Sequence, residues 1–301
     1  MFITDIIASP GMINSRYPIE LPLIGVPILF PKACPNTIIY NADEISPGII
    51  VCFHRARNLR TVITYLASNY DAKIIVKECD TEPRFETLVG TQFTDRIDYS
   101  FEKQTQSFFH KTKLLNDMIE MSTTEVVANY DTDVVLPIQS VYKAYEMIKS
   151  GESDAVYPYG CGVYQKAVTY PQEVFEEFLG SMDIDVLDRN STITNSTIGW
   201  TQFIRRSNYI DSFMMNEEFA AWGPEDCELH YRLNALGNKV DRINDYIYHL
   251  DHARSTDSWF SNPKWQGNND LWNMIRQLPK EKLISYYSTL EYVKRRKDAR
   301  I

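Results

Sequence analysis

An apolar run that ends in two acidic residues constrains the fold of this chain strongly. The run lies between Glu125 and Tyr130, and Asp131-Thr132-Asp133 follow it directly. In a β-strand, side chains two residues apart point to the same side. Asp131 and Asp133 are therefore expected to project together at the point where a buried strand leaves the core.

Two converging carboxylates offer the hard oxygen ligands that Mg²⁺ or Mn²⁺ prefers, with a diphosphate on the other side of the cation. This chemistry is typical of a transferase that uses a nucleotide-activated substrate. The chain repeats the spacing at Asp183-Ile184-Asp185, without an apolar run before it, and this copy is expected to lie in a loop. The alternative for Asp131 and Asp133 is likewise a solvated corner between strand and loop.

Composition excludes several classes of protein. The chain has 301 residues, 44% of them hydrophobic and 24% charged, and a formal net charge of −9, which is ordinary for a soluble globular protein. The acidic balance disfavours nucleic-acid binding. No stretch approaches the roughly 18 apolar residues of a membrane span, and the first residues lack a signal-like basic start. Five scattered cysteines favour a reduced, cytoplasmic setting.

The spacing of apolar residues predicts alternating strands and helices in the first half. Ile49 to Phe53 is predicted to be a strand, Asn58 the N-cap of the helix after it, and residues 73–78 the second strand of a parallel βαβ unit. A helix over 110–121 then precedes a third strand over 126–130. We therefore predict an α/β fold, a single domain whose mostly parallel central sheet is flanked by helices.

The second half is less regular. Helices are predicted over 141–148, over 174–179 with Gly180 as C-terminal cap, and over 225–236 with Gly237 just past its end. Extended structure is predicted over 154–159, strands over 200–205, 239–243 and 245–249, and a long aromatic loop over 249–270.

Three parts are expected along the chain: an N-terminal extension over residues 1–46 packed on the main domain, the main domain over 47–279, and a basic C-terminal helix over 280–301. The Lys294-Arg295-Arg296-Lys297 end of that helix is expected to be solvated, since cations are favourable near a helix C-terminus. The alternative is weak contact with an anionic membrane surface or with a partner.

Trp222-Gly223-Pro224-Glu225-Asp226 precedes a predicted helix. Acidic residues at a helix start are stabilising by themselves, which is the purely structural explanation. The functional explanation is that adjacent carboxylates in a turn point in different directions. One can then bind a hydroxyl while the other takes its proton, and Trp222 offers a flat apolar face to a sugar ring.

Two histidines follow a predicted strand near residue 250. Neutral imidazole is a common metal ligand, and we expect His252 to join Asp131 and Asp133 around one cation, with His249 as a second ligand or neighbour. The alternative is a loop histidine that pairs with Asp251.

Polar residues near predicted strand ends are candidates for donor binding, because loops at the carboxyl ends of strands form the ligand site of an α/β sheet. Arg55 and Arg57 can pair with phosphate there, and Glu78 can accept hydrogen bonds from a ribose or base. Three residues that open the next helix can also face phosphates: Lys111, Lys113 and Asn116. A glycine-rich phosphate loop is absent from the sequence, which argues against a P-loop NTPase or a dinucleotide dehydrogenase.

Taken in order, these segments resemble the GT-A glycosyltransferases, and the C-terminal half is similar to the galactosyltransferase and chondroitin-polymerase type. The likeness runs from about Ile49 to about Asn269. It rests on Phe53-His54-Arg55-Ala56-Arg57, Ile74 to Glu78, Asn129 to Asp133, Trp222 to Asp226, and His249 to His252. The most specific parts of the likeness are the Trp-Gly-x-Glu-Asp block and the distance along the sequence that separates this block from Asp-x-Asp.

The resemblance implies a nucleotide-binding βαβ half, an acceptor-binding half and Mn²⁺ or Mg²⁺ as cofactor. It implies transfer of a sugar from a nucleotide donor, usually a UDP-sugar, to a hydroxyl of a glycan or other acceptor, with inversion. Asp131 and Asp133 then match the metal and diphosphate motif, and His252, with His249, the later metal ligand. Asp226 matches the general base, and Glu225 the residue that holds the acceptor or donor sugar.

The chain departs from this pattern in two places. Lys77-Glu78-Cys79-Asp80 stands where many members carry two aspartates and a glycine, and Pro224 replaces a frequent glycine. The first departure concerns the contact with uridine, and the second concerns the loop that would bind the acceptor. Two other functions remain open on the sequence, namely a non-catalytic carbohydrate- or nucleotide-binding module and a nucleotidyltransferase.

Overall fold

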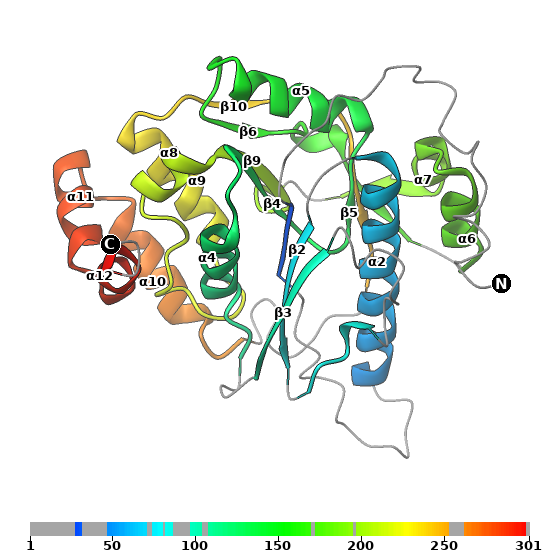
Figure 1. Ribbon diagram of the computed structural model, residues 1–301, viewed down its shortest axis with the longest axis horizontal. Helices are drawn as coiled ribbons and strands as arrows, with labels where there is room; N and C mark the ends of the chain where they lie inside the picture. The colour runs from blue at the N-terminus through cyan, green and yellow to red at the C-terminus, as the bar shows by residue number, and fades with distance from the viewer. Residues whose placement is uncertain are drawn as a thin grey trace.

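The computed structural model places two β-sheets among helices (Figure 1). The residues it describes are 28–31, 47–70, 74–80, 82–86, 97–103, 108–169, 172–194, 197–252 and 262–298. The predicted α/β class is confirmed by this arrangement.

The larger sheet has seven strands in the order β10-β6-β9-β4-β1-β2-β3. Its strands are β1 (Ile28–Pro31), β2 (Ile74–Asp80), β3 (Ile97–Lys103), β4 (Val126–Tyr130), β6 (Ala155–Tyr157), β9 (Thr201–Arg205) and β10 (Val240–Arg242). Only β9 runs antiparallel to its described neighbours, β4 and β6, and the other pairings are parallel. The predicted mostly parallel sheet is therefore confirmed only in part, because β9 is reversed in the larger sheet and most pairings of the second sheet are antiparallel.

The smaller sheet has four strands in the order β5-β11-β7-β8. They are β5 (Val134–Val135), β7 (Gln165–Val168), β8 (Ser191–Ile193) and β11 (Ile247–Leu250), and the 3₁₀ turn η1 (Gly162–Tyr164) precedes β7. Because β5 begins only a few residues after β4, the chain passes from one sheet to the other through Asp131-Thr132-Asp133.

Helices cover both faces of the larger sheet. The helices of the described part of the chain are α2 (Pro47–Asn69), α4 (Lys111–Met121), α5 (Ile138–Lys149), α6 (Gln172–Ser181), α7 (Ile184–Arg189), α8 (Arg206–Asp211), α9 (Glu225–Leu236), α10 (Trp265–Ile275), α11 (Lys280–Thr289) and α12 (Glu291–Asp298). In Figure 1, α10, α11 and α12 gather beyond α4 and α9, whereas α6 and α7 lie on the opposite side, beyond α2.

Strand alternation separates two hydrophobic cores. In β4, Val126 and Ala128 pack in a core with residues of α2, α5 and α6, whereas Val127 packs in a second core with residues of α4, α8 and α9. Successive side chains of a strand point to opposite faces, so one short apolar segment contributes to both cores. The site residues lie where this fully buried strand ends.

Most predicted elements are confirmed. Strands β2 and β4 and helix α4 lie where apolar spacing predicts them, and α9 spans Glu225–Leu236 as predicted. Gly237 has φ +94°, the left-handed conformation that ends a helix without a Cβ clash.

The strand predicted over Ile49 to Phe53 is wrong, because these residues belong to α2. Five apolar residues suit a buried helix as well as a strand, and no turn separates this run from the helical spacing that continues through Leu66. Asn58 accordingly lies inside the helix and is not its N-cap. The strand before α2 is β1, within the segment predicted as an N-terminal extension, while the rest of residues 1–46 lies outside the described residues.

Three predictions in the second half also need correction. Asp183 is not in a plain loop, because its side chain accepts a hydrogen bond from Asp185 N (3.1 Å) and caps α7. Gly180 lies inside α6, which ends at Ser181. The aromatic loop predicted over 249–270 ends early, since Trp265 begins α10, and residues 253–261 lie outside the described residues.

The C-terminal segment forms two helices, α11 and α12, and not one. Arg296 near its end is buried at 5% exposure, so the expectation of a wholly solvated basic end is wrong for this residue. Within the described ranges, no helix combines the length and the apolar character that crossing a bilayer would require.

Candidate active site

The pairing of β5 with β11 builds the first part of the site. Asp131 N donates a hydrogen bond to Trp200 O (3.0 Å), and Leu250 N donates one to Asp133 O (2.7 Å). In the β5–β11 register, His249 stands opposite Val134, next to Asp133. Two very short strands thus bring a mid-chain acid beside a histidine from far along the chain.

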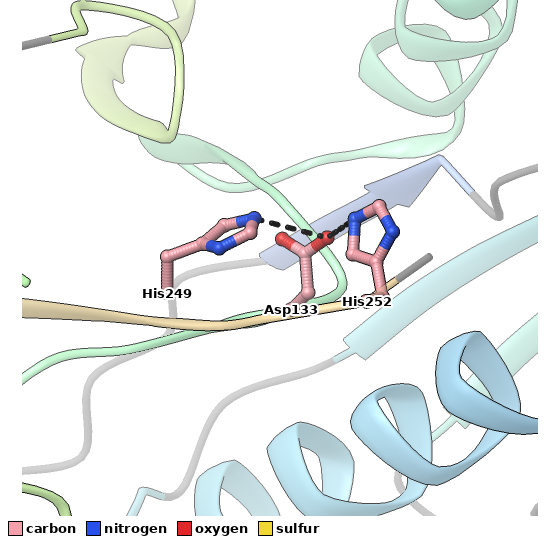
Figure 2. A group of neighbouring side chains, drawn as sticks. All are labelled: Asp133, His249 and His252. Carbon is pink, nitrogen blue, oxygen red and sulfur yellow. Dashed lines mark ion pairs between the residues drawn. The ribbon is translucent and has the colours of Figure 1, made fainter. Parts of the chain in front are cut away.

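Asp133, His249 and His252 form a compact group of candidate metal ligands (Figure 2). The Asp133 Oδ2 atom lies 3.0 Å from His252 Nε2 and 3.6 Å from His249 Nε2. One ligand atom from each residue lies within 4.8 Å of the others. Two imidazole nitrogens and one carboxylate oxygen form a donor set that transition-metal dications such as Mn²⁺ accept.

Neighbouring residues hold this group in place. The Trp200 indole stacks on the His249 ring at 5.4 Å and 16° between planes. Asn58 Nδ2 donates to Leu250 O (2.6 Å), and Asp251 Oδ1 accepts from His252 N (2.9 Å). These contacts orient the His249 ring and hold the backbone between the two histidines.

Asp131 is not part of that group. Its Oδ1 atom lies 3.1 Å from Lys111 Nζ, and the same nitrogen lies 3.6 Å from Asp226 Oδ2. Burial, with smaller contributions from the charges of Asp133 and Asp226, raises the pKa of Asp131 to about 7, although the charge of Lys111 opposes the shift. Burial alone would lower the pKa of Lys111, but Asp131, Asp226 and Glu225 hold it well above its usual value.

The first turn of α9 supplies two acids with different surroundings. Glu225 is 4% exposed, and its Oε2 atom has no hydrogen-bond partner among the described residues. Burial, followed by the charge of Asp226, raises the pKa of Glu225 to about 8. Asp226 faces Lys111, and its Oδ1 atom accepts from Gln202 Nε2 at 3.5 Å.

Gly199 leaves room for the Asp226 carboxylate. A Cβ atom at position 199 would lie 2.0 Å from Asp226 Oδ2, far inside contact distance. Gly199 and Gln202 are site residues that the sequence analysis misses. A glycine just before a predicted strand is a signal of close backbone approach, but it does not say which side chain approaches.

Trp222 lies at the surface and precedes the two acids closely in the sequence. Its side chain is 39% exposed and stacks on Trp265 at 5.0 Å and 23° between planes. Trp222 O accepts hydrogen bonds from Asn262 Nδ2 (2.6 Å) and Asn268 Nδ2 (3.2 Å). Two indole rings thus form one platform, whereas the sequence suggested Trp222 alone.

Several predicted donor-binding residues have other contacts. Arg57 lies in α2, donates to Asn58 Oδ1 (3.0 Å) and sits 4.1 Å over the Phe175 ring. Arg55 also belongs to α2, but its side chain lies outside what the structure describes. Both residues therefore lie in a helix and not in a loop after a strand.

Glu78 and Lys113 are also engaged within the chain. Glu78 is buried and accepts hydrogen bonds from Phe85 N (3.0 Å) and the Tyr99 hydroxyl (2.7 Å). Lys113 Nζ pairs with Glu102 (2.8 Å) and Asp117 (2.9 Å). Their roles in donor binding stay predictions, and the contacts show that each carries an internal interaction.

Comparison with known proteins gives no match to a family model and no match among curated proteins. The match to S. aureus TarS covers 75% of this chain and 36% of the TarS chain, at 16% sequence identity and TM-score 0.46. The match to TarS 1-349 in complex with UDP-GlcNAc covers 77% of this chain and 60% of the TarS fragment, at 14% sequence identity and TM-score 0.45. A third match is the mannosyltransferase PcManGT from Pyrobaculum calidifontis in complex with GDP-Man and Mn²⁺. It covers 84% of this chain and 63% of the PcManGT chain, at 11% sequence identity and TM-score 0.44.

The chain thus spans between 36% and 63% of the length of these solved proteins. Because their TM-scores lie below 0.5, these likenesses carry no argument about this chain. The function proposed next is therefore carried by the site residues of this chain alone.

Proposed function

We propose that this protein is a metal-dependent glycosyltransferase. It transfers a sugar from a nucleotide donor, a UDP-sugar, to a hydroxyl of a glycan acceptor, and it inverts the anomeric configuration. The observation that carries the proposal is the convergence of Asp133, His249 and His252, with Asp226 joined to the neighbouring Asp131 through Lys111.

The ligand group fits a divalent cation. Its three donor atoms lie within 4.8 Å of one another, and their side chains are largely shielded from solvent. Asp133, His249 and His252 would hold the ion, as Mn²⁺ or Mg²⁺. When bound, such an ion neutralises the charge that develops on a leaving diphosphate.

Asp226 is the proposed general base. The acceptor oxygen forms a bond to the anomeric carbon, the bond from that carbon to the diphosphate oxygen breaks, and its electron pair leaves with UDP. Asp226 takes the proton of the acceptor hydroxyl. One displacement at the anomeric carbon inverts its configuration. The ion pair with Lys111 and the hydrogen bond from Gln202 hold the Asp226 carboxylate in place.

Glu225 and Trp222 are the proposed sugar contacts. Burial, followed by the charge of Asp226, raises the pKa of Glu225, which favours the protonated carboxyl group, and this form can both donate and accept a hydrogen bond. Its Oε2 atom, which has no hydrogen-bond partner among the described residues, suits a sugar hydroxyl, because a buried polar atom without a partner is costly. The Trp222 platform offers an apolar face to the acceptor ring.

The decisive experiment measures UDP release and sugar transfer from a panel of UDP-sugars with Mn²⁺ and candidate glycans. The protein should release UDP from one donor in a metal-dependent way. Donor-induced thermal stabilisation without UDP release would favour a non-catalytic binding module. Release of diphosphate from a nucleoside triphosphate and a sugar phosphate, with no UDP from any UDP-sugar, would favour a nucleotidyltransferase. Either result would overturn the proposal.

The metal group is tested separately by calorimetry. Asp133→Ala should remove Mn²⁺-dependent UDP binding, because it deletes the carboxylate that both histidines face. Asp185→Ala, in the second Asp-x-Asp on the exposed side of α7, is the matched control and should bind like the unmodified protein. Unchanged UDP binding by Asp133→Ala would contradict the metal assignment.

A further inference from the structure

Arg296 near the end of α12 is enclosed by acids. Its side chain is 6% exposed and contacts Asp117 Oδ1 (2.7 Å), Glu120 Oε2 (2.6 Å) and Glu217 Oε1 (2.5 Å). Burial alone would lower the pKa of Arg296, but Glu217 and Asp117 raise it above its usual value. One guanidinium group therefore joins α12 to α4 and to the segment after α8.

Glu217 connects this cluster to the neighbouring loop. Its side chain is 7% exposed, and its Oε1 atom also accepts from Asn116 Nδ2 (2.9 Å). Asn116 in turn accepts from Met215 N (2.8 Å) and donates to Met215 O (2.9 Å). The segment around residue 216 is thus fixed to α4 by paired hydrogen bonds on one side and by Arg296 on the other.

The loop continues along α4 toward the proposed base. Thr112 Oγ1 donates to Phe219 O (3.0 Å), and Ala221 N donates to Phe109 O (3.0 Å). We define residues 215–224 as the acceptor loop, since Trp222 lies within it and Asp226 follows. The loop therefore runs along α4 from Asn116 back toward Lys111, which itself contacts Asp226.

Backbone strain explains why the loop needs such support. Ala221 within it, and Phe213 and Met214 just before it, have φ between +57° and +71°. Residues other than glycine rarely adopt positive φ, which costs on the order of 1–3 kcal/mol unless the surroundings enforce it. Three contacts supply that enforcement here: Arg232 of α9 donates to Met214 O (2.6 Å), the Tyr292 hydroxyl of α12 donates to Phe213 O (3.1 Å), and Ala221 N donates to Phe109 O (3.0 Å).

We propose that Arg296 is a positioning residue of the transfer reaction, acting through Glu217 on the acceptor loop. The basic C-terminal helix then belongs to the acceptor half of the molecule. This inference rests on the proposed function for its kinetic consequence, but the conformational consequence for residues 215–224 is independent of it. Arg296 does not touch the reacting groups, so its effect should fall on the acceptor and not on the donor.

Arg296→Gln is the principal variant. It removes the charge that faces Glu217, so hydrogen exchange at the amides of residues 215–224 should become faster while exchange in β4 stays unchanged. Arg295→Gln is the matched control, since Arg295 also contacts Glu217 (2.6 Å) but is 59% exposed. It should leave exchange in the loop unchanged, because exposed ion pairs contribute little.

Kinetics distinguish positioning from a general loss of stability. In Arg296→Gln, kcat/KM for the acceptor should fall about tenfold, which corresponds to roughly 1.4 kcal/mol. The donor KM and the Mn²⁺-dependent affinity for UDP should stay within about twofold, and hydrolysis of the donor should gain relative to transfer. Glu217→Gln keeps a side-chain oxygen for Asn116 and serves as a second variant if Arg296→Gln does not fold.

The outcomes separate this inference from the proposed function. If hydrogen exchange over residues 215–224 is unchanged in both Arg296→Gln and Glu217→Gln, the positioning role is overturned, whatever the enzyme activity. Faster exchange with equal losses for donor and acceptor would also overturn it, since the effect would then be general. If the unmodified protein transfers no sugar, the proposed function fails, and the exchange experiment still decides whether Arg296 orders the loop.

Discussion

At the residue scale, the position of the Asp226 carboxylate depends on the absence of a side chain at Gly199. In Gly199→Ala, the new Cβ atom would lie 2.0 Å from Asp226 Oδ2, so the carboxylate must move. A displacement of about 1 Å in a catalytic group can reduce the rate roughly 100-fold. Transfer should therefore fall by that order, while Mn²⁺-dependent UDP binding in calorimetry stays unchanged.

Gly180→Ala is the control for this substitution. Gly180 lies inside α6, and a Cβ atom there would meet nothing within 4 Å. Alanine favours a helix over glycine by about 1 kcal/mol, so this variant should be as active as the unmodified protein and slightly more stable. Full activity of Gly199→Ala would show that Asp226 tolerates displacement and is not the base.

Asp226→Asn tests the base directly. The amide keeps the size of the side chain but cannot accept a proton at neutral pH, so transfer should fall about 10²–10⁴-fold. UDP binding should persist, because the proposed ligands Asp133, His249 and His252 are untouched. Parallel loss of transfer rate and UDP affinity would instead make Asp226 a structural residue that anchors Lys111.

Residue-scale prediction from sequence succeeds where a rule of local geometry applies. The placement of Asp131 and Asp133 at a strand end follows from the apolar run before them. Asp133 Oδ2 lies 3.0 Å from His252 Nε2, and the shared metal site stays a prediction. Gly199, Gln202 and the link through Lys111 depend on which distant segments pack together, which a single sequence does not contain.

At the element scale, long periodic segments are predicted well and short apolar runs are not. Helix α9 carries both a Pro-Glu-Asp start and a glycine just past its end, so its bounds can be read from sequence. Ile49 to Phe53 carries no such signal and joins α2. The two-residue strand β5, which positions Asp133, is too short to show any period.

Helix α9 is held by an ion pair inside the protein. Glu228 and Arg232 are fully buried, with Arg232 Nε 2.7 Å from Glu228 Oε1, and the same oxygen accepts from the Tyr287 hydroxyl (2.5 Å). Arg232→Leu would leave the Glu228 charge buried without its cation, which costs about 3–5 kcal/mol. Urea unfolding should show this loss of free energy of unfolding.

The control for Arg232→Leu is Lys294→Ala, which breaks an exposed ion pair with Glu291 in α12. Its urea midpoint should equal that of the unmodified protein, because exposed pairs contribute little. An unchanged midpoint for Arg232→Leu would mean that the attraction within the buried pair only offsets the free-energy cost of its desolvation. Packing alone would then hold α9 against α11.

At the scale of the whole molecule, Asp117 joins three parts of the chain and should govern stability in acid. It contacts Lys77 of β2 (2.8 Å), Lys113 of α4 (2.9 Å) and Arg296 of α12 (2.7 Å). Burial alone would raise the pKa of Asp117, but hydrogen bonds from Lys77, Arg296 and Lys113 lower it from 3.8 to about 2. The folded state therefore binds this proton less readily than the unfolded chain.

A carboxyl group with a lowered pKa in the folded state stabilises that state above the unfolded pKa, and the contribution disappears as pH falls through the folded pKa. For Asp117 the window lies between about pH 4 and pH 2, and the contribution above it is on the order of 2 kcal/mol. Asp117→Asn should therefore be less stable than the unmodified protein by this amount at pH 5–7. The difference should shrink as pH falls from 4 toward 2, because protonation then removes the same charge from the unmodified protein.

Urea unfolding at pH 7, 5, 4 and 3 measures this difference in stability, with Asp185→Asn on the exposed side of α7 as control. A difference that stays constant from pH 5 to pH 3 would show that Asp117 acts through shape and hydrogen bonding rather than through its charge.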